Sequence, residues 1–272
     1  MTDIVSLETL AGRIAPGESV AIPADNAGVS MAATAALIEA GITGLRLVCV
    51  PLSGMQADLL IGAKAVASLE TSAITLGEAG GAPRFGVAVR EGAFALLDAT
   101  CPAIYAGLLA AQKGVPFMPI AGIIGSDLLR VRPDWKVIDS PTGVPGKVVV
   151  VPAITPDVAL FHAPDADRSG NIRIGRHREL ADMAYASKRT LVTVERIVER
   201  NLLETEDSAA GVLPSLYVDT VAVAERGAWP LRLWDEYDSD AAEVARYAAM
   251  ARTEEGFRAY LSAFLTRRKQ VA

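Results

Sequence analysis

Short apolar runs alternate along the chain with segments of mixed polarity, and turn residues separate the two kinds. The apolar runs have the length and composition of buried strands, and they cover residues 18–23, 45–51, 65–70, 94–97, 147–151, 158–162, 190–194 and 216–224. Helices are predicted over residues 30–40, 56–61, 102–113, 178–187 and 257–265. This alternation predicts an α/β fold with an open, mostly parallel sheet flanked by helices, in one domain over residues 1–272.

The stretch from residue 156 to residue 171, PDVALFHAPDADRSGN, is the clearest strand followed by a turn. Pro164 is expected to end the strand after residues 158–162, because proline removes a ladder donor. The polar residues that follow would then lie at the carboxyl end of a strand, where open α/β sheets bind ligands. This loop is therefore a predicted wall of a site, whereas His162 is more typical of a hydrogen-bonded core residue.

Composition narrows the class of protein further. Of the 272 residues, 51% are hydrophobic and 21% are charged, and the net charge of -6 gives no indication of a basic surface for nucleic acid. No apolar run reaches the roughly 18–20 residues of a membrane span, and no signal peptide is recognisable. Two cysteines and two histidines match no metal spacing. A metal-free protein of the cytoplasm is expected.

Three loops have the composition to approach a ligand closely. Residues 24–28 (ADNAG) lead into a helix whose N-terminus could receive an anion, or they form an ordinary turn. Residues 77–86 carry four glycines around Glu78, although a flexible loop with a solvated acid is the commoner case. Residues 115–129 mix prolines and glycines with apolar side chains, which predicts a buried irregular loop that satisfies its own backbone groups or meets a ligand.

Two further residues carry reactive groups. Cys101 stands at the start of a predicted helix, where a thiol can become more acidic, but a buried inert cysteine is commoner. Glu195 follows the strand at 190–194 and is a second carboxylate at the expected ligand edge. No Ser-His-Asp, Cys-His or metal constellation is visible in the sequence. The residues alone leave open whether Cys101 or Glu78 has a catalytic role.

Three segments together resemble the alpha subunit of type I coenzyme A transferases, the glutaconate and 3-oxoacid CoA-transferase family. They are VPFMPIAGIIGSDL (115–128), PAITPDVALFHAPDADRSGNIRIG (152–175) and TLVTVERIV (190–198). The resemblance implies a heterodimer or heterotetramer with a beta subunit that moves CoA between an acyl-CoA and a free carboxylic acid. In that family the nucleophilic glutamate lies on the beta subunit and forms a glutamyl-CoA intermediate. No catalytic residue and no permanently bound cofactor are therefore expected in this chain, and the CoA thioester is a substrate.

The resemblance also implies that four loops line the cleft shared with the partner. Their candidate substrate-binding residues are Asn26, Gly28, Ser30, Ser53, Gly54, Glu78, Gly80, Gly81, Gly122, Gly125 and Ser126. The backbone N–H groups of residues 122–126 are expected to support the reacting thioester. Ile120 and Ala121 stand where relatives often carry an arginine for a substrate carboxylate, which weakens the expectation of a dicarboxylate substrate. The loop at 24–28 also departs from the family, because it holds a single glycine.

Two other functions remain open at this point. One is a related CoA-thioester hydrolase that acts on ring-derived acyl-CoA, and the other is a non-catalytic module that binds a small ligand with the same fold. Both enzyme readings require a partner chain. The mean hydropathy of +0.31 is high for a monomer of this size and predicts an apolar surface buried against another subunit.

Overall fold

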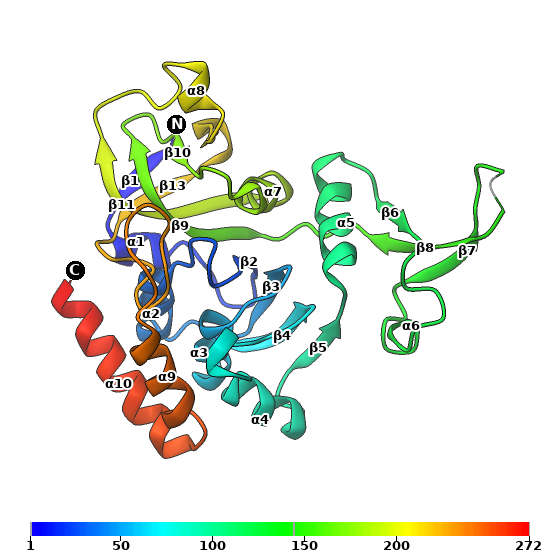
Figure 1. Cartoon of the computed structure of the whole chain (residues 1–272), viewed down its shortest axis with the longest axis horizontal. Coiled ribbons are helices and arrows are strands. Elements are labelled where there is room, and N and C mark those ends of the chain that lie inside the picture. Colours follow the sequence, from blue (N-terminus) through cyan, green and yellow to red (C-terminus); the bar gives the residue numbers. More distant parts are fainter. Residues whose placement is uncertain (1, 144, 272) are drawn as a thin grey trace.

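The computed structural model describes residues 2–143 and 145–271. A large sheet with the strand order β1-β13-β11-β9-β2-β3-β4-β5 runs through it, and all pairs along this path are parallel (Figure 1). The short strands β10 and β12 are added antiparallel. These strands span β1 Asp3–Val5, β2 Ser19–Pro23, β3 Leu45–Val50, β4 Val66–Thr71, β5 Ala95–Asp98, β9 Val158–Asp167, β10 Ile172–Arg173, β11 Arg189–Val198, β12 Val212–Leu213 and β13 Thr220–Val223. The predicted fold class is confirmed.

Helices cover both faces of this sheet. Because side chains alternate in direction along each strand, each strand contributes apolar side chains to both faces. On β2, Val20 and Ile22 face one apolar cluster, and Ala21 faces the other. The first cluster is closed by α1 Leu7–Ala11, α2 Met31–Glu39, α3 Met55–Gly62, α4 Pro83–Glu91, α9 Ala241–Met250 and α10 Glu254–Val271, and the second by α5 Cys101–Gln112 and α7 Arg178–Ala186. No helix in the described part of the chain is both long and apolar enough to cross a membrane.

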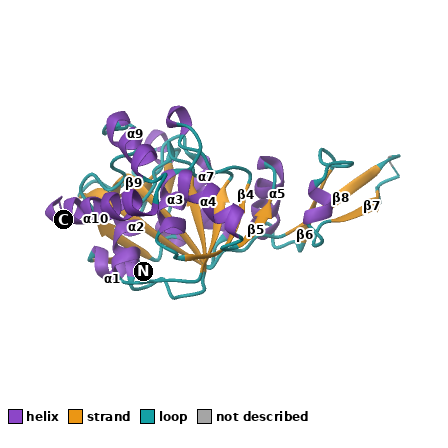
Figure 2. Cartoon of the chain, turned by 90° about the horizontal axis from the view of Figure 1, so that it is seen from below, coloured by secondary structure: helices purple, strands orange, loops and turns teal. Residues whose placement is uncertain are grey.

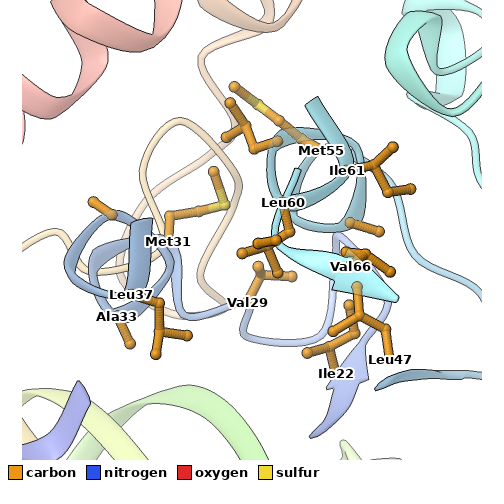
Figure 3. Close-up of a cluster of buried hydrophobic side chains, with 14 of the residues drawn as sticks. Ile22, Val29, Met31, Ala33, Leu37, Leu47, Met55, Leu60, Ile61 and Val66 are labelled. Atoms are coloured by element: carbon orange, nitrogen blue, oxygen red, sulfur yellow. The ribbon is translucent and has the colours of Figure 1, made fainter. Parts of the chain in front are cut away.

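The first cluster holds α2 and α3 against the middle of the sheet. Figure 3 shows Met31 and Leu37 of α2, Leu60 of α3, and Ile22 and Leu47 of the two neighbouring strands in one apolar group. Each of these side chains is at most 1% exposed, so each contributes roughly 1.5–3 kcal/mol of burial free energy. This packing fixes the loops that precede the two helices at the carboxyl ends of β2 and β3.

Most predicted strands and helices are present within a few residues of the expected bounds, but the strand over 158–162 is longer. β9 continues through Pro164 to Asp167, so the prediction that Pro164 ends it is wrong. The hydrogen-bond pattern explains why β9 tolerates a proline at Pro164. Two residues earlier, the N–H of His162 points toward the segment after β2 and donates to the Gly28 carbonyl at 2.7 Å. The backbone nitrogen of Pro164 points to the same side, but β2 has already ended there, so the sheet needs no N–H donor at this position. The acidic residues after Pro164 are buried in this strand and do not form a loop at the ligand edge.

An arm, residues 115–153, projects from the main sheet (Figures 1 and 2). It contains β6 Phe117–Ile120, β7 Lys136–Asp139 and β8 Lys147–Pro152 in an antiparallel sheet of order β6-β8-β7, with α6 Leu128–Val131 between β6 and β7. The prediction of a buried irregular loop over 115–129 is wrong, because this segment forms a strand, a turn and a helix that are mostly exposed or half-buried. Ile123 is buried in the second apolar cluster, whereas Val115, Phe117 and Ile124 face outward from this chain.

Candidate functional site

The carboxyl ends of β2 and β3 frame a cavity of about 440 Å³. The segment after β4 and the loop between β13 and α9 complete its walls, which are mostly apolar. Polar groups come from Asp25, Asn26, Thr75, Arg232 and Ser239. Open α/β sheets bind ligands at this edge, and the volume is typical of small-molecule sites. Of the residues predicted from the sequence, Asn26 lies directly in the lining.

Asp25 is the carboxylate of this cavity, and sequence reasoning did not select it as a site residue. Its Oδ2 accepts the N–H of Met55 at the start of α3, at 3.1 Å. Its Oδ1 is shielded from solvent and has no hydrogen-bond partner among the described residues. Burial raises the pKa of the Asp25 carboxyl to about 6, although the N–H groups of Met55 and Gly54 favour its charged form, and the nearby Asp58 adds to the rise. Asp25 is therefore poised to exchange a proton close to neutral pH.

Gly54 adjoins Asp25 from the loop after β3, and Ser53 precedes Gly54 in the same loop. A Cβ at Gly54 would lie 2.2 Å from Asp25 Oδ2 and 2.3 Å from the Thr75 carbonyl oxygen, so only glycine lets the carboxylate approach the start of α3. Ser53 is fully buried, and its N–H donates to the Ala73 carbonyl at 3.3 Å. These two predicted residues thus shape the cavity from behind, without lining it.

Gly28 and Ser30 hold the loop after β2 in place and do not line the cavity. Gly28 has φ of +78°, and a Cβ there would lie 2.1 Å from the His162 carbonyl oxygen. The buried Ser30 immediately precedes α2, as predicted, but its hydroxyl pairs with Thr193 Oγ1 at 2.6 Å and does not cap the helix. The sequence therefore identifies the loop after β2 that borders the cavity, but Gly28 and Ser30 serve in internal packing.

Glu195 lies on β11 at a similar level of the sheet, but its carboxylate is saturated. It accepts hydrogen bonds from His162 Nε2 and the Tyr237 hydroxyl, both at 2.8 Å, and from the N–H groups of Arg226 and Gly227 at 2.7 and 3.1 Å. Burial opposes ionisation, but the bonds from His162, Tyr237 and Arg226 together lower the pKa of Glu195 to about 2. Glu195 is thus a fixed anion that ties β9 and β11 to the segment after β13.

His162 has the core role predicted for it. Its ring is fully buried, and burial lowers the pKa of His162 despite the neighbouring Glu195 carboxylate. The neutral ring therefore donates from Nε2 to Glu195 and accepts the Thr193 hydroxyl at Nδ1, 2.9 Å away. With both nitrogens engaged, His162 connects the Ser30 and Glu195 networks inside the sheet.

Glu78, Gly80 and Gly81 lie together on an exposed turn after β4, around the short 3-10 helix η1 Gly77–Ala79. Gly80 and Gly81 border a second hollow of about 450 Å³, which also meets the side chains of Arg90 and Arg252. Gly80 has φ of +97°, a backbone conformation that favours glycine at this position. Nothing lies within 4 Å of a Cβ placed at Gly81. No contact inside the described chain requires glycine at Gly81.

Gly122, Gly125 and Ser126 are exposed on the arm, in the turn between β6 and α6, and do not line the 440 Å³ cavity. Gly125 has φ of +82°, a backbone conformation that favours glycine. Gly122 has no such backbone demand, and a Cβ there would meet nothing within 4 Å. As at Gly81, no contact within the described chain accounts for the missing side chain.

Cys101 is exposed, so the interpretation of this residue as a buried cysteine is wrong. It begins α5 behind the N-cap Thr100, and its thiol lies 3.2 Å from the Ser72 hydroxyl. The Ser72 hydroxyl in turn donates to the Pro51 carbonyl at 2.7 Å, on the loop that borders the cavity. No group of three or more potential metal ligands gathers anywhere in the described residues.

The fold and the cavity define an α/β protein with a ligand site at the carboxyl edge of its sheet, and comparison with known proteins identifies the family. The coenzyme A transferase family profile matches residues 5–224. The chain belongs to this family, which confirms the resemblance seen in the sequence, and it is a CoA-transferase subunit of the alpha type.

Three curated relatives match most of the chain. It is 31% identical to the A subunit of glutaconate CoA-transferase from Acidaminococcus fermentans over 76% of this chain and 70% of that one. It is 30% identical to the A subunit of 3-oxoadipate CoA-transferase from Pseudomonas knackmussii over 97% and 94% of the two chains. It is also 28% identical to the cholesterol ring-cleaving hydrolase IpdA subunit of Rhodococcus jostii over 96% and 91%.

Two solved structures share the architecture over nearly the whole chain. Glutaconate coenzyme A-transferase from Acidaminococcus fermentans superimposes with a TM-score of 0.85 at 28% identity, over 96% of this chain and 88% of that one. A variant of the decarboxylase AibA/AibB superimposes with a TM-score of 0.84 at 28% identity, over 99% and 98%.

Proposed function

We propose that this chain forms a heterodimer or heterotetramer with a beta-type partner and moves CoA between an acyl-CoA and a free carboxylic acid. The partner supplies a glutamate that carries CoA as a glutamyl thioester, and this chain supplies a wall of the cleft. Exchanging one thioester for another through covalent intermediates divides a difficult transfer into two easier steps. The CoA thioester is the substrate. The two free cysteines agree with the reducing cytoplasm in which we place the reaction.

The 440 Å³ cavity at the carboxyl ends of β2 and β3 is the observation that carries this proposal. The walls that follow β2, β3 and β4 lie in the part of the chain that matches the family, and the mostly apolar lining suits the acyl part of a thioester. Of the two carboxylates at this edge, Glu195 is saturated by hydrogen bonds, and the unpartnered oxygen of Asp25 is shielded from solvent. A nucleophile from the partner fits this arrangement.

The arm is our candidate for the surface that meets the partner. Its outward apolar side chains include Phe117, Ile124, Val131, Val137 and Ile138, between 38% and 60% exposed. A three-stranded sheet that leaves so much apolar surface in water gains little stability by itself. A second subunit that covers the arm would bury this surface and bring the turn with Gly122 toward the shared cleft.

Assaying the chain alone and with its partner tests the proposal. CoA transfer between an acyl-CoA and a free acid is expected only when both chains are present, together with stable co-elution of the two. Robust transfer by the purified chain alone would contradict it. Incubation with an acyl-CoA that is radiolabelled in its CoA part should release the free acid and leave CoA covalently attached to the partner chain and not to this one.

A substitution on the arm tests the role of its turn in the assembled enzyme. Gly122→Val has open space and an ordinary backbone conformation, so the fold should remain intact. If the backbone N–H groups of this turn support the reacting carbonyl, turnover falls by on the order of 100-fold, as for the loss of one oxyanion donor. Normal turnover in a properly assembled variant would remove the turn from the site. The strain at Gly125 makes that position the poorer choice for this test.

A hydrolase is the second candidate, favoured by the similarity to the IpdA subunit over nearly the full length of both chains. Water would then replace the free acid, and the substrate would be a ring-derived acyl-CoA. The two activities separate in one assay. A transferase requires the acceptor acid and conserves the thioester, whereas a hydrolase acts on its acyl-CoA without any acceptor.

A further inference from the structure

We propose that the 440 Å³ cavity selects an apolar acyl group that carries a hydroxyl, and that Asp25 is the residue that recognises this hydroxyl. The inference rests on the proposed function for the CoA thioester to which the acyl group belongs. It concerns binding, however, and is tested separately from turnover.

The walls of the cavity set the apolar part of this specificity. Leu52, Leu76 and Leu231 come from three different loops, and Val244 adds a fourth apolar side chain from α9. Leu76 and Leu231 are each less than 6% exposed, so they form a fixed surface and not a mobile fringe. Such a wall favours a hydrocarbon chain by about 0.8 kcal/mol for each methylene that it buries.

Asp25 provides the polar part. One carboxylate oxygen is held by the N–H of Met55, which anchors the side chain at the start of α3. The other oxygen, Oδ1, lies covered beside the cavity and has no partner among the described residues. Pairing with a ligand requires a small rotation about the Cβ–Cγ bond, a soft torsion, that turns Oδ1 toward the cavity while Oδ2 stays within reach of the Met55 N–H. A buried oxygen without a partner costs roughly 1–3 kcal/mol, which a ligand that pairs with it recovers.

A hydroxyl fits Asp25 better than a carboxylate or a ketone does. A hydroxyl donates to the ionised carboxylate and accepts from the protonated carboxyl, so it pairs with both forms. A ketone pairs only with the protonated form, and a carboxylate is repelled by the ionised one. Asp58 adds negative charge from α3, and Arg232, exposed at the lining, is the one cation among the cavity residues. A second carboxylate on the substrate would therefore have to remain near Arg232, away from Asp25.

Unreactive CoA thioethers test this proposal in the assembled heteromer by calorimetric titration at pH 7.5. The probes are S-hexyl-CoA, S-(hydroxyhexyl)-CoA with the hydroxyl at carbons 3 to 6, and S-(5-carboxypentyl)-CoA. The best hydroxyl position is expected to bind at least 10-fold tighter than S-hexyl-CoA, and the carboxyl probe more weakly than S-hexyl-CoA. Equal binding of the hydroxyl and plain probes at every position, or tightest binding of the carboxyl probe, would overturn the proposal.

Variants assign the effect to Asp25. Asp25→Ala should reduce the hydroxyl preference to less than 3-fold. Asp25→Asn retains the hydrogen bond to α3 and should strengthen binding of the carboxyl probe about 10-fold, because the repelling charge is gone. Asp58→Asn is the matched control: Asp58 is also a buried carboxylate at a helix start, but all its partners lie within the chain, so the preference for the hydroxyl probe over S-hexyl-CoA should not change. An unchanged preference in both Asp25 variants, or an equal loss in the control, would contradict the assignment.

The thioethers also separate this inference from the proposed function. Because they carry no carbonyl, they bind without being transferred. A heteromer that shows the hydroxyl preference but transfers no CoA would overturn the proposed function and leave the specificity standing. A heteromer that transfers CoA without the preference would do the reverse.

Discussion

Two carboxylates at the same edge of the sheet have opposite surroundings. Glu195 accepts four hydrogen bonds inside the chain, and its pKa falls to about 2. Asp25 keeps one oxygen without a partner beside an apolar cavity, and burial raises its pKa to about 6. Position at the carboxyl edge of a parallel sheet therefore does not make an acid functional. The two acids differ in how many hydrogen bonds the chain itself provides: Glu195 has a full set, whereas Asp25 has an oxygen that a ligand can pair with.

The surroundings of the two acids explain the difference. Arg226 has φ of +46°, and with Gly227 it turns two successive N–H groups toward Glu195, as in an anion-binding nest. Within the described chain, Asp25 receives N–H groups only from the start of α3, on one side of its carboxylate. Glu195 thus fastens the strands on one side of β9, while Asp25 remains available on the other.

Removing the saturated acid should have the largest effect on stability. Glu195→Ala leaves His162, Tyr237 and two N–H groups without their acceptor, and the expected loss is about 3–5 kcal/mol in the free energy of unfolding. Urea unfolding measures it. Glu199→Ala is the matched control, because the Glu199 side chain is 75% exposed beside the end of the same strand and pairs, among the described residues, with Arg168 alone. The loss in this variant should remain below about 0.5 kcal/mol. Equal losses in the two variants would show that the Glu195 network is not structural.

A smaller loss in the free energy of unfolding is expected when the contact between Asp25 and Gly54 is crowded. Gly54→Ala brings a methyl group to within 2.2 Å of Asp25 Oδ2, and the required shift should cost about 1–3 kcal/mol. Gly81→Ala, which has open space and no positive φ, should change thermal stability by less than about 0.5 kcal/mol. If Gly54→Ala were as stable as Gly81→Ala, the close contact between Asp25 and the start of α3 would be disproved.

Asp25→Asn should give the smallest change in the free energy of unfolding, and it should stabilise the chain where the other variants destabilise it. The folded-state pKa of Asp25 lies above its unfolded value of 3.8, so the folded chain binds more protons between about pH 4 and 6. Wild-type stability therefore falls as the pH rises through this window, and the asparagine variant escapes that fall. At pH 7 the variant should be more stable by about 1–2 kcal/mol, allowing for the part of the residue that meets solvent. Parallel stability curves from pH 4 to 7 would contradict this.

Periodicity in the sequence predicts the main sheet well, because its strands are buried on both faces and its helices are punctuated by glycine and proline. β9 is underestimated because proline inside a central strand is rare, and its tolerance depends on where β2 ends. The arm is mispredicted for a different reason. Its apolar residues have the composition of a core, and no local pattern reveals which of them face away from this chain.

The candidate site is predictable by loop and less so by residue. Asn26, Ser53 and Gly54 lie in or directly behind the cavity, whereas Gly28 and Ser30 belong to the internal packing. Asp25 gives no signal of its own, because an aspartate after a strand is a common turn residue. Its burial arises from Gly54 and α3, some thirty residues later, and contacts of that kind are visible only after the chain has folded.

The most direct measurement is a carbon-13 NMR titration of the side-chain carboxyl groups in this chain, labelled and assembled with its partner. The Asp25 carboxyl, assigned by its absence in Asp25→Asn, should titrate near pH 6. It should also shift when the preferred S-(hydroxyhexyl)-CoA probe is added. The Glu195 carboxyl should remain ionised to below pH 3 and not respond to the probe. An Asp25 midpoint near 4 that the probe does not move would contradict the distinction between the open and the saturated carboxylate.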